Sequence, residues 1–172
     1  EASLISSLPS QLRQADLTLV GNRQQRVGDD INEGRDSRQA RQTWGRLIRS
    51  EPRISQPGLV SARSQALLTG FQAGLDVWAN GDWKTGLYVG QLSGDVQVRG
   101  FSGGQQGQDV GFNSLRNRYI GMYGSYQNAQ NFYLDAVLQA ADYRSELYTR
   151  SNASALTKGY GWLASLEAGQ PL

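Results

Sequence analysis

The residue types that could carry out chemistry in this chain are carboxylates, serines and arginines. Asp135 and Glu167 could form the acid pair of a glycosidase, in which one carboxyl group donates a proton and the other acts as base or nucleophile. Serine nucleophiles need a base, and the sequence contains no histidine and no cysteine. These two absences exclude a Ser-His-Asp triad, a thiol nucleophile, a disulfide framework and cysteine-ligated zinc. We therefore expect no enzyme activity, and we interpret Asp135 and Glu167 as polar residues of a wetted surface.

Ligand-binding motifs are equally sparse. The glycine-rich segment 103–107 lacks the Lys and Ser/Thr of a phosphate-binding loop, and no pattern indicates a metal or another cofactor. A basic-rich stretch carries Arg23, Arg26, Arg35, Arg38, Arg41, Arg46 and Arg49. The acids interleaved with it are Asp29, Asp30, Glu33 and Asp36. Because these acids interrupt the stretch and the net charge is only +2, we expect no nucleic-acid partner.

Alternating apolar and polar residues predict about six β-strands after residue 42. The clearest pattern is Ser64–Trp78, in which Phe71 and Leu75 share one face and Gln72 and Asp76 share the other. The predicted strands are Thr43–Arg49, Ser64–Trp78, Trp83–Val98, Ser114–Gln127, Asn131–Tyr143 and Lys158–Gln170.

The connections between these strands alternate between long and short. Long polar segments lie at Glu51–Arg63, Arg99–Asn113 and Tyr148–Leu156, whereas tight turns lie at Asn80–Asp82 and Asn128–Gln130. A meander that is long at one end and tight at the other is typical of outer-membrane barrels, which have short periplasmic turns and longer outside loops. The sequence contains no run of about 18 apolar residues, the length that a transmembrane helix needs. The mean hydropathy of -0.52 does not detect strands in which only every second residue is apolar.

The sequence therefore predicts an all-β membrane fold, an up-and-down antiparallel transmembrane β-barrel preceded by a helix. The apolar face of each strand should meet lipid, and the small or polar face should line the lumen. The residues predicted to face lipid are Phe71, Leu75, Leu87, Phe132, Leu134, Trp162 and Leu166. Those predicted to face the lumen are Asp76, Tyr88, Asp135, Gln139 and Glu167. The facing of Ser114–Gln127 stays open, because Ile120 and Met122 compete with Tyr119 and Tyr123.

A soluble β-sandwich that serves as a binding module is the alternative that the same alternation allows. Two features disfavour it. Several strand patterns are much longer than the usual strand of about 5–6 residues. In addition, Asp76, Asp135 and Glu167 share the small or polar face, and a dry core does not accept three carboxylates whereas a watery lumen does.

Residues 1–42 are expected to form a linker helix and a polar segment, and residues 43–172 to form the wall. The helix is predicted from Ser7 to about Val27, with Pro9 in its first turn and Gly28 as its stop. Its apolar face carries Leu8, Leu12, Ala15 and Leu19. The helix arginines that we expect to pair with the lumen carboxylates are Arg13, Arg23 and Arg26. Such hydrated pairs contribute only about 0–1 kcal/mol each, so their role would be to position the helix in the pore.

Short segments of the chain resemble those of autotransporters, the type V secretion proteins. The helix segment Ser7-Leu8-Pro9-Ser10-Gln11-Leu12, running on into Arg26-Val27-Gly28-Asp29, resembles their linker helix. The strand segments that resemble theirs are Thr43-Trp44-Gly45-Arg46, Gly86-Leu87-Tyr88-Val89-Gly90, Phe132-Tyr133-Leu134-Asp135-Ala136 and Gly161-Trp162-Leu163-Ala164-Ser165-Leu166-Glu167-Ala168-Gly169. The matches follow the order of the family along nearly the whole chain. They mark this sequence as similar to the N-terminal half of the translocator β-domain with its linker helix.

This resemblance implies a barrel of about twelve strands with the helix threaded through its pore. It implies export of an N-terminal passenger across the bacterial outer membrane, with lipid, the passenger, the remaining barrel strands and the barrel-assembly machinery as partners. Some relatives cleave themselves at paired asparagines in the helix, whereas the helix predicted here contains only Asn22. The chain stops at Pro171-Leu172 without the family's C-terminal aromatic, and we expect it to be a piece of a translocator. A small structural or adhesive outer-membrane barrel is the alternative function.

Overall fold

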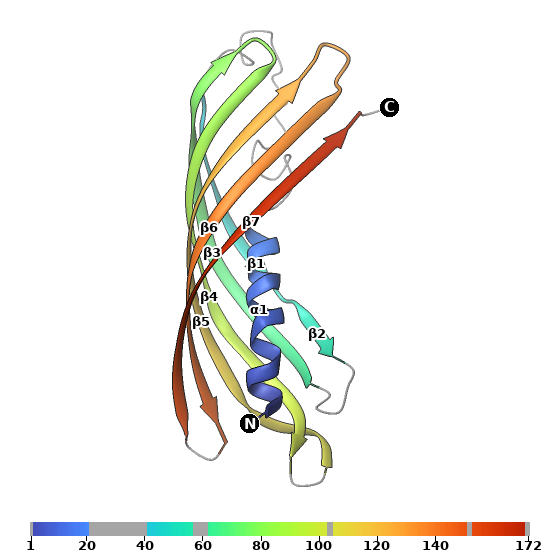
Figure 1. Ribbon diagram of the computed structural model, residues 1–172, viewed down its shortest axis with the longest axis vertical. Coiled ribbons are helices and arrows are strands. Elements are labelled where there is room, and N and C mark those ends of the chain that lie inside the picture. The colour runs from blue at the N-terminus through green and yellow to red at the C-terminus, as the bar shows by residue number, and fades with distance from the viewer. Residues whose placement is uncertain (1, 21–40, 57–61, 103–104, 151–152, 171–172) are drawn as a thin grey trace.

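The computed structural model describes residues 2–20, 41–56, 62–102, 105–150 and 153–170. Its elements are α1 (Ala2–Val20), β1 (Thr43–Ser50), β2 (Arg53–Gln56), β3 (Ala62–Asn80), β4 (Trp83–Ser102), β5 (Gln105–Gln127), β6 (Tyr133–Thr149) and β7 (Ser154–Gly169). The strands form one antiparallel sheet in the order β1-β3-β4-β5-β6-β7, with β2 paired to β3 beside β1. The sheet is strongly curved, and α1 lies against its concave side (Figure 1). The described residues form no second sheet, so the β-sandwich alternative is wrong.

Regular alternation of burial along the strands divides the sheet into two faces. In β3, Leu68, Gln72 and Asp76 point to the concave side and are buried, whereas Phe71 and Leu75 point to the convex side and are exposed. The antiparallel register carries this division from strand to strand, because residues that are opposite each other share a face. The predicted facing of this strand therefore agrees with the structure.

The facing of β5, which the sequence left open, is settled by its neighbours. Tyr119 and Tyr123 point to the concave side, and Ile120 and Met122 point to the convex side. The tyrosines have room on the concave side because β4 presents Gly86 and Gly90 opposite them. A Cβ atom added to Gly86 would lie 2.3 Å from the Tyr123 ring.

Aromatic rings lie over glycines at several strand junctions of the concave face. A Cβ atom on Gly121 would lie 2.2 Å from Cζ of Tyr88, which is directly opposite in the register. The same arrangement places Trp44 over Gly74, Tyr143 over Gly161 and Tyr133 over Gly169. These glycines are required by the space that the rings occupy, since none of them has a positive φ.

The strands extend beyond the predicted ones at the end opposite the tight turns. Segment Arg99–Asn113, predicted as a loop, is mostly paired strand of β4 and β5, and Tyr148–Leu156 belongs largely to β6 and β7. Segment Glu51–Arg63 contains the short strand β2, which the sequence analysis missed. These segments are polar or glycine-rich and lack apolar alternation, so the backbone pairing there leaves no pattern in the sequence.

The helix begins earlier than predicted. It spans Ala2–Val20, so Pro9 lies in its interior and not in its first turn. Proline has no N–H to donate to the carbonyl of Ile5, a loss that costs about 3 kcal/mol in an isolated helix. Ile5 is exposed to solvent, whereas Leu4 and Leu8 are buried against the sheet. Burial of those leucines against the sheet therefore offsets the cost of the proline. The prediction that Pro9 lies in the first turn did not take this tertiary packing into account.

Candidate functional site

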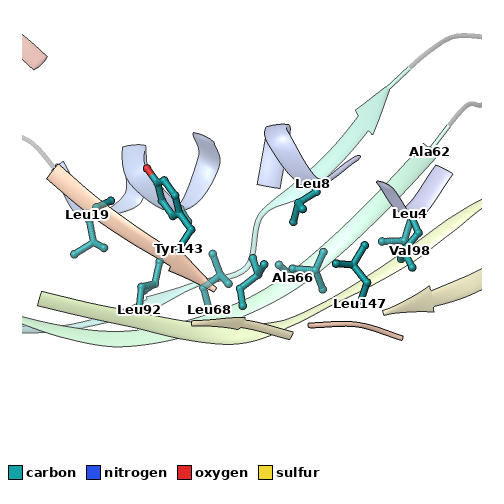
Figure 2. Close-up of a cluster of buried hydrophobic side chains, with 14 of the residues drawn as sticks. Leu4, Leu8, Leu19, Ala62, Ala66, Leu68, Leu92, Val98, Tyr143 and Leu147 are labelled. Carbon is teal, nitrogen blue, oxygen red and sulfur yellow. The ribbon is translucent and has the colours of Figure 1, made fainter. Parts of the chain in front are cut away.

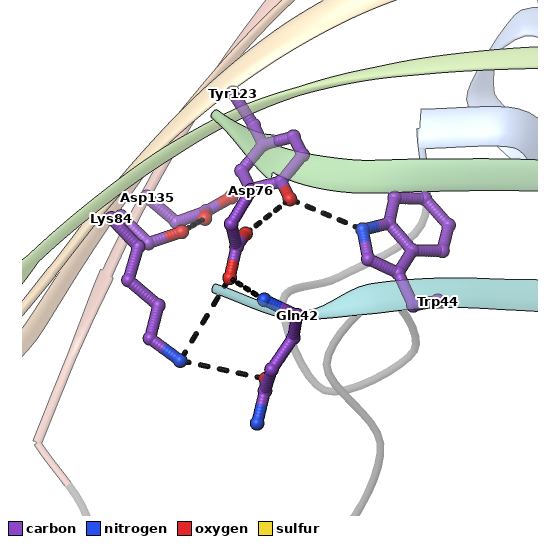
Figure 3. A network of polar contacts seen from close by, with 7 residues as sticks. Gln42, Trp44, Asp76, Lys84, Tyr123 and Asp135 are labelled. Atoms are coloured by element: carbon purple, nitrogen blue, oxygen red, sulfur yellow. Dashed lines mark hydrogen bonds and ion pairs between the residues drawn. The ribbon is translucent and has the colours of Figure 1, made fainter. Parts of the chain in front are cut away.

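A polar network lies on the concave face near the tight-turn end of the sheet (Figure 3). The Tyr123 hydroxyl donates to Oδ1 of Asp76 at 2.5 Å and accepts from Nε1 of Trp44 at 3.1 Å. The other oxygen of Asp76, Oδ2, accepts from the backbone N–H of Gln42 at 3.1 Å and lies 4.0 Å from Nζ of Lys84. The network ties the residue that precedes β1 to strands β3, β4 and β5. It therefore fixes the point at which the chain enters the wall.

The other two carboxylates of this end are also held by hydroxyl groups of the wall. The Ser125 hydroxyl donates to Oδ1 of Asp135, and the Tyr133 hydroxyl donates to Oε1 of Glu167 at 2.7 Å. Asp135 and Glu167 are opposite each other on β6 and β7, so they share the concave face. Each acid is therefore paired with a hydroxyl group of the wall, and the two hydrogen-bonded pairs lie side by side on the polar part of the concave face.

Three side-chain contacts hold α1 on the sheet. Nδ2 of Asn113 donates to Oε1 of Gln11 at 2.8 Å, and the Tyr143 hydroxyl donates to Oδ2 of Asp16 at 2.6 Å. At the C-terminal end, Nη2 of Arg46 donates to the carbonyl oxygen of Leu19 at 2.6 Å. The last carbonyls of a helix lack intrahelical partners and carry partial negative charge, so a guanidinium is a suitable partner for them.

Between these contacts the helix packs on an apolar part of the concave face (Figure 2). The helix residues in this cluster are Leu4, Leu8, Ala15 and Leu19, and wall residues include Leu68, Leu92, Val96, Val98, Leu115 and Leu147. The prediction of a uniformly small or polar concave face is therefore wrong for the part that α1 covers. A buried helix face needs an apolar partner, and the wall supplies it.

The structure places the sequence-predicted wall residues on two opposite faces. The residues predicted to face the lumen, Asp76, Tyr88, Asp135, Gln139 and Glu167, all lie on the concave face. There the Tyr88 hydroxyl donates to Oε1 of Gln139 at 2.8 Å. Of the residues predicted to face lipid, Phe71, Leu75, Leu87, Leu134, Trp162 and Leu166 lie on the convex side, whereas Phe132 lies in the turn before β6 and is exposed. Several are far more exposed than core side chains are, with 78% for Trp162 and 73% for Leu166.

The helix residues predicted for the pore are only partly described. Arg13 lies on the exposed side of α1, and among the described residues it has no ion pair within 4.0 Å. Asn22, Arg23 and Arg26 lie outside the described residues. Where the structure is described, the concave-face carboxylates take wall residues and Gln42 as partners, and the pairing expected for Arg13 is not observed.

Sequence reasoning missed Asp16, Tyr143 and Arg46 as residues that hold the helix. A signal for Asp16 was present, because it lies four residues after Leu12 and three before Leu19, on the apolar side of α1. Tyr143 has the parity of the concave face of β6. Nothing in the sequence shows that these two side chains meet, since they are 127 residues apart.

Replacing Tyr143 by phenylalanine is expected to loosen the helix from the wall. The change removes the hydroxyl donor from the buried Asp16 carboxylate and should lower the free energy of unfolding by about 1–2 kcal/mol. Urea unfolding of the complete protein, followed by tryptophan fluorescence, measures this loss. Tyr148→Phe is the matched control, because its hydroxyl donates to Glu146 on the exposed surface and its loss should cost less than about 0.5 kcal/mol. Equal losses in the two variants would contradict the assigned role of Tyr143.

Other kinds of site are not found in the described part of the chain. No group of three metal-ligating side chains occurs among the residues that the structure describes. Helix α1, the helix that it describes, is not apolar enough along its length to cross a membrane.

The family model described as Autotransporter beta-domain matches residues 43–172. No significant match was found among curated proteins or among solved structures.

Proposed function

Because this chain belongs to the autotransporter beta-domain family, we propose that it forms part of the pore and membrane anchor through which an N-terminal passenger is exported. The family is one of outer-membrane translocators, and the antiparallel sheet preceded by a helix is consistent with its β-barrel. In this proposal residues 43–172 form the wall, and residues 1–42 form the linker that occupies the lumen.

The observation that carries the proposal is the opposite character of the two faces of the sheet. The convex face presents exposed apolar side chains, whereas the concave face holds hydrogen-bonded carboxylates and a packed helix. A soluble protein buries its apolar face, but in a membrane wall that face meets hydrocarbon and the polar face lines the lumen. We therefore assign Phe71, Leu87 and Trp162 to the lipid side, and Asp76 and Asp135 to the lumen.

The direction of α1 supports export toward the long-connection end. Figure 1 places the N-terminus of α1 at the end of the sheet where β4 connects to β5 and β6 to β7. The C-terminal end of the helix, at Leu19, reaches the middle of the wall near Gly90 and Arg46. Strand β1 then starts at Thr43, opposite Leu75, toward the tight turns. If the tight turns face the periplasm, as in other outer-membrane barrels, a passenger joined to the N-terminal end of α1 lies outside the cell.

The edges of the sheet support additional wall strands as partners. Strands β1 and β7 end the strand order, and backbone groups on an open edge cost several kcal/mol each in hydrocarbon. Further strands, placed with the help of the barrel-assembly machinery, would close the wall between β7 and β1. In this proposal the chain acts as a passage and an anchor. A structural or adhesive barrel without a passenger gains no support from α1, because such a barrel needs no linker helix in its lumen.

Surface exposure of a passenger tests the proposal. In cells that produce the complete protein with a protease-sensitive reporter before residue 1, protease added outside is expected to degrade the reporter. Heat-modifiable migration of the membrane-embedded part should be retained. The matched control carries the same reporter before residue 1 and a stop codon after residue 42, which removes residues 43–172, and its reporter should stay protected inside the cell. A reporter that remains protected although the barrel assembles would refute the export function.

A further inference from the structure

Four cations share one level across the convex face, and we name this level the basic row. Its charged members are Arg49, Arg116, Arg144 and Lys158. The register places Arg116 opposite Arg144 and Arg144 opposite Lys158, while Thr69 and Ser93 continue the level back to Arg49. All four cations are exposed, and the strands that carry them, β1, β5, β6 and β7, span the whole sheet (Figure 1).

Carboxylates of the protein reach two of the four cations of the basic row, both at exposed positions. Arg49 contacts Glu51 at 3.0 Å, and Arg144 lies 3.8 Å from Asp142. Neither Arg116 nor Lys158 has a carboxylate within 4.0 Å in the part of the chain that the structure describes. Like charges directly opposite each other on neighbouring strands destabilise a sheet. Arg116 and Lys158, which flank Arg144 in the register, are therefore the cations that an anion from outside the chain can reach without competition from a carboxylate within 4.0 Å among the described residues.

The position of the basic row identifies where that anion lies. On β4, Ser93 is ten residues beyond Trp83, which faces outward at the tight-turn end. Ten residues of a strand tilted by about 40° rise about 25 Å, which is the height of the apolar band of a membrane barrel. The outward residues between these two levels include Leu87, Val89 and, on neighbouring strands, Ile120. One level of mixed character lies between the apolar band and the basic row, with Gln91, Arg118 and Asp142 in register between Phe71 and Tyr160. The basic row thus lies one level beyond the apolar band, on the side of the long connections.

We propose that the basic row binds the phosphate groups of anionic lipid headgroups in the outer leaflet. The proposal rests on the membrane placement given above and adds a lipid class to it. Guanidinium groups bind phosphate oxygens with two parallel hydrogen bonds, and Lys158 adds a point charge. The occupant must be apolar on one side and anionic on the other, because the row lies one level beyond an apolar band. A lipid meets both conditions, whereas a nucleic acid or an acidic peptide meets only the second.

The residues next to the basic row fit the same occupant. Tyr160 is 88% exposed on the neighbouring level of β7, and Phe71 is exposed on the corresponding level of β3. Aromatic side chains of this kind form the girdle at a membrane interface. Headgroup phosphates would therefore contact the cations of the row while the acyl chains lie along the aromatic and apolar levels below.

Lipid binding to the complete protein in detergent tests the proposal. The probes are lipid A with its phosphates, the same lipid without them, and inorganic phosphate, with dissociation constants taken from native mass spectrometry. The variant carries Arg116→Gln, Arg144→Gln and Lys158→Gln. The matched control carries Arg53→Gln, Arg63→Gln and Arg99→Gln, which removes three cations of the same sheet that lie farther toward the long connections. Both are first checked for heat-modifiable migration and surface exposure of the reporter.

The unchanged protein should prefer phosphorylated over dephosphorylated lipid A by about tenfold or more. The variant of the basic row should lose most of that preference, and the control should stay within about twofold of the unchanged protein. Millimolar inorganic phosphate should not displace the lipid, because it lacks acyl chains. Equal losses in variant and control, an unaffected variant, or displacement by inorganic phosphate would each overturn the inference. The proposed function would stand in those cases, since it fails only when the reporter stays inside the cell.

Discussion

Replacing Leu87 by arginine is expected to prevent stable membrane assembly of this protein. Leu87 lies in the middle of the apolar band, opposite Leu75 on β3 and Met122 on β5, and its side chain is 47% exposed on the convex face. A cation on the lipid side near the bilayer midplane costs about 2–4 kcal/mol. We expect the variant to lose most of its heat-modifiable form in outer membranes and to be degraded.

The matched control for this change is Gln97→Arg. Gln97 points to the same face of β4, but it lies beyond the basic row, where water surrounds the wall. Near or beyond the interface the same cation costs only about 0–1 kcal/mol, so this variant should assemble normally. If both variants assembled equally well, the convex face would not meet hydrocarbon, and the membrane placement of the sheet would be wrong.

The second large effect is expected from Gly121→Ala on the concave face. The added Cβ would lie 2.2 Å from Cζ of Tyr88, whose ring is almost completely buried. The ring must move, and the hydrogen bond from its hydroxyl to Gln139 must break. Overpacking of this kind costs about 1–3 kcal/mol, and the lost hydrogen bond costs about 1 kcal/mol more. Urea unfolding of the complete protein should show the sum.

Gly124→Ala is the matched control, because a Cβ there meets only a methyl group of Thr85 at 3.9 Å. Its unfolding free energy should change by less than about 0.5 kcal/mol. Adding Tyr88→Ala to Gly121→Ala should give less destabilisation than the two single changes together, with a coupling of about 1 kcal/mol or more. Additive single effects would show that the ring over Gly121 is not what requires a glycine.

The face of each long strand was predictable from the sequence, whereas the ends of the strands were not. Alternation placed Phe71 and Asp76 on opposite sides because an apolar convex face and a polar concave face both select their residues. Beyond the apolar band no such selection acts, so β2 and the outer parts of β4 and β5 looked like loops. Backbone hydrogen bonds form these parts of the sheet, and they leave no mark on side-chain polarity.

For the wall residues of the site, the sequence predicted which side chains share a face but not which side chains they contact. Parity placed Asp135 and Glu167 on the concave face, but long-range register decides that Ser125 and Tyr133 are their partners. The ion pair predicted for Arg13 is not observed among the described residues, and the sequence does not show how far the helix lies from each carboxylate. The sequence could not show where α1 packs on the sheet, because its polar contacts, such as Asn113 with Gln11, join residues 102 positions apart.

The apolar cluster between α1 and the concave face has a consequence for the order in which the protein assembles. Leu68, Leu92 and Leu115 are almost fully buried in the cluster that the helix completes. In a vacated channel each of them would meet water, at a cost of up to about 1.5–3 kcal/mol per side chain. A pore without the helix would therefore expose apolar surface and be less stable than the filled pore. We therefore expect α1 to bind the concave face while the strands of the wall assemble, so that the pore is occupied as soon as it forms.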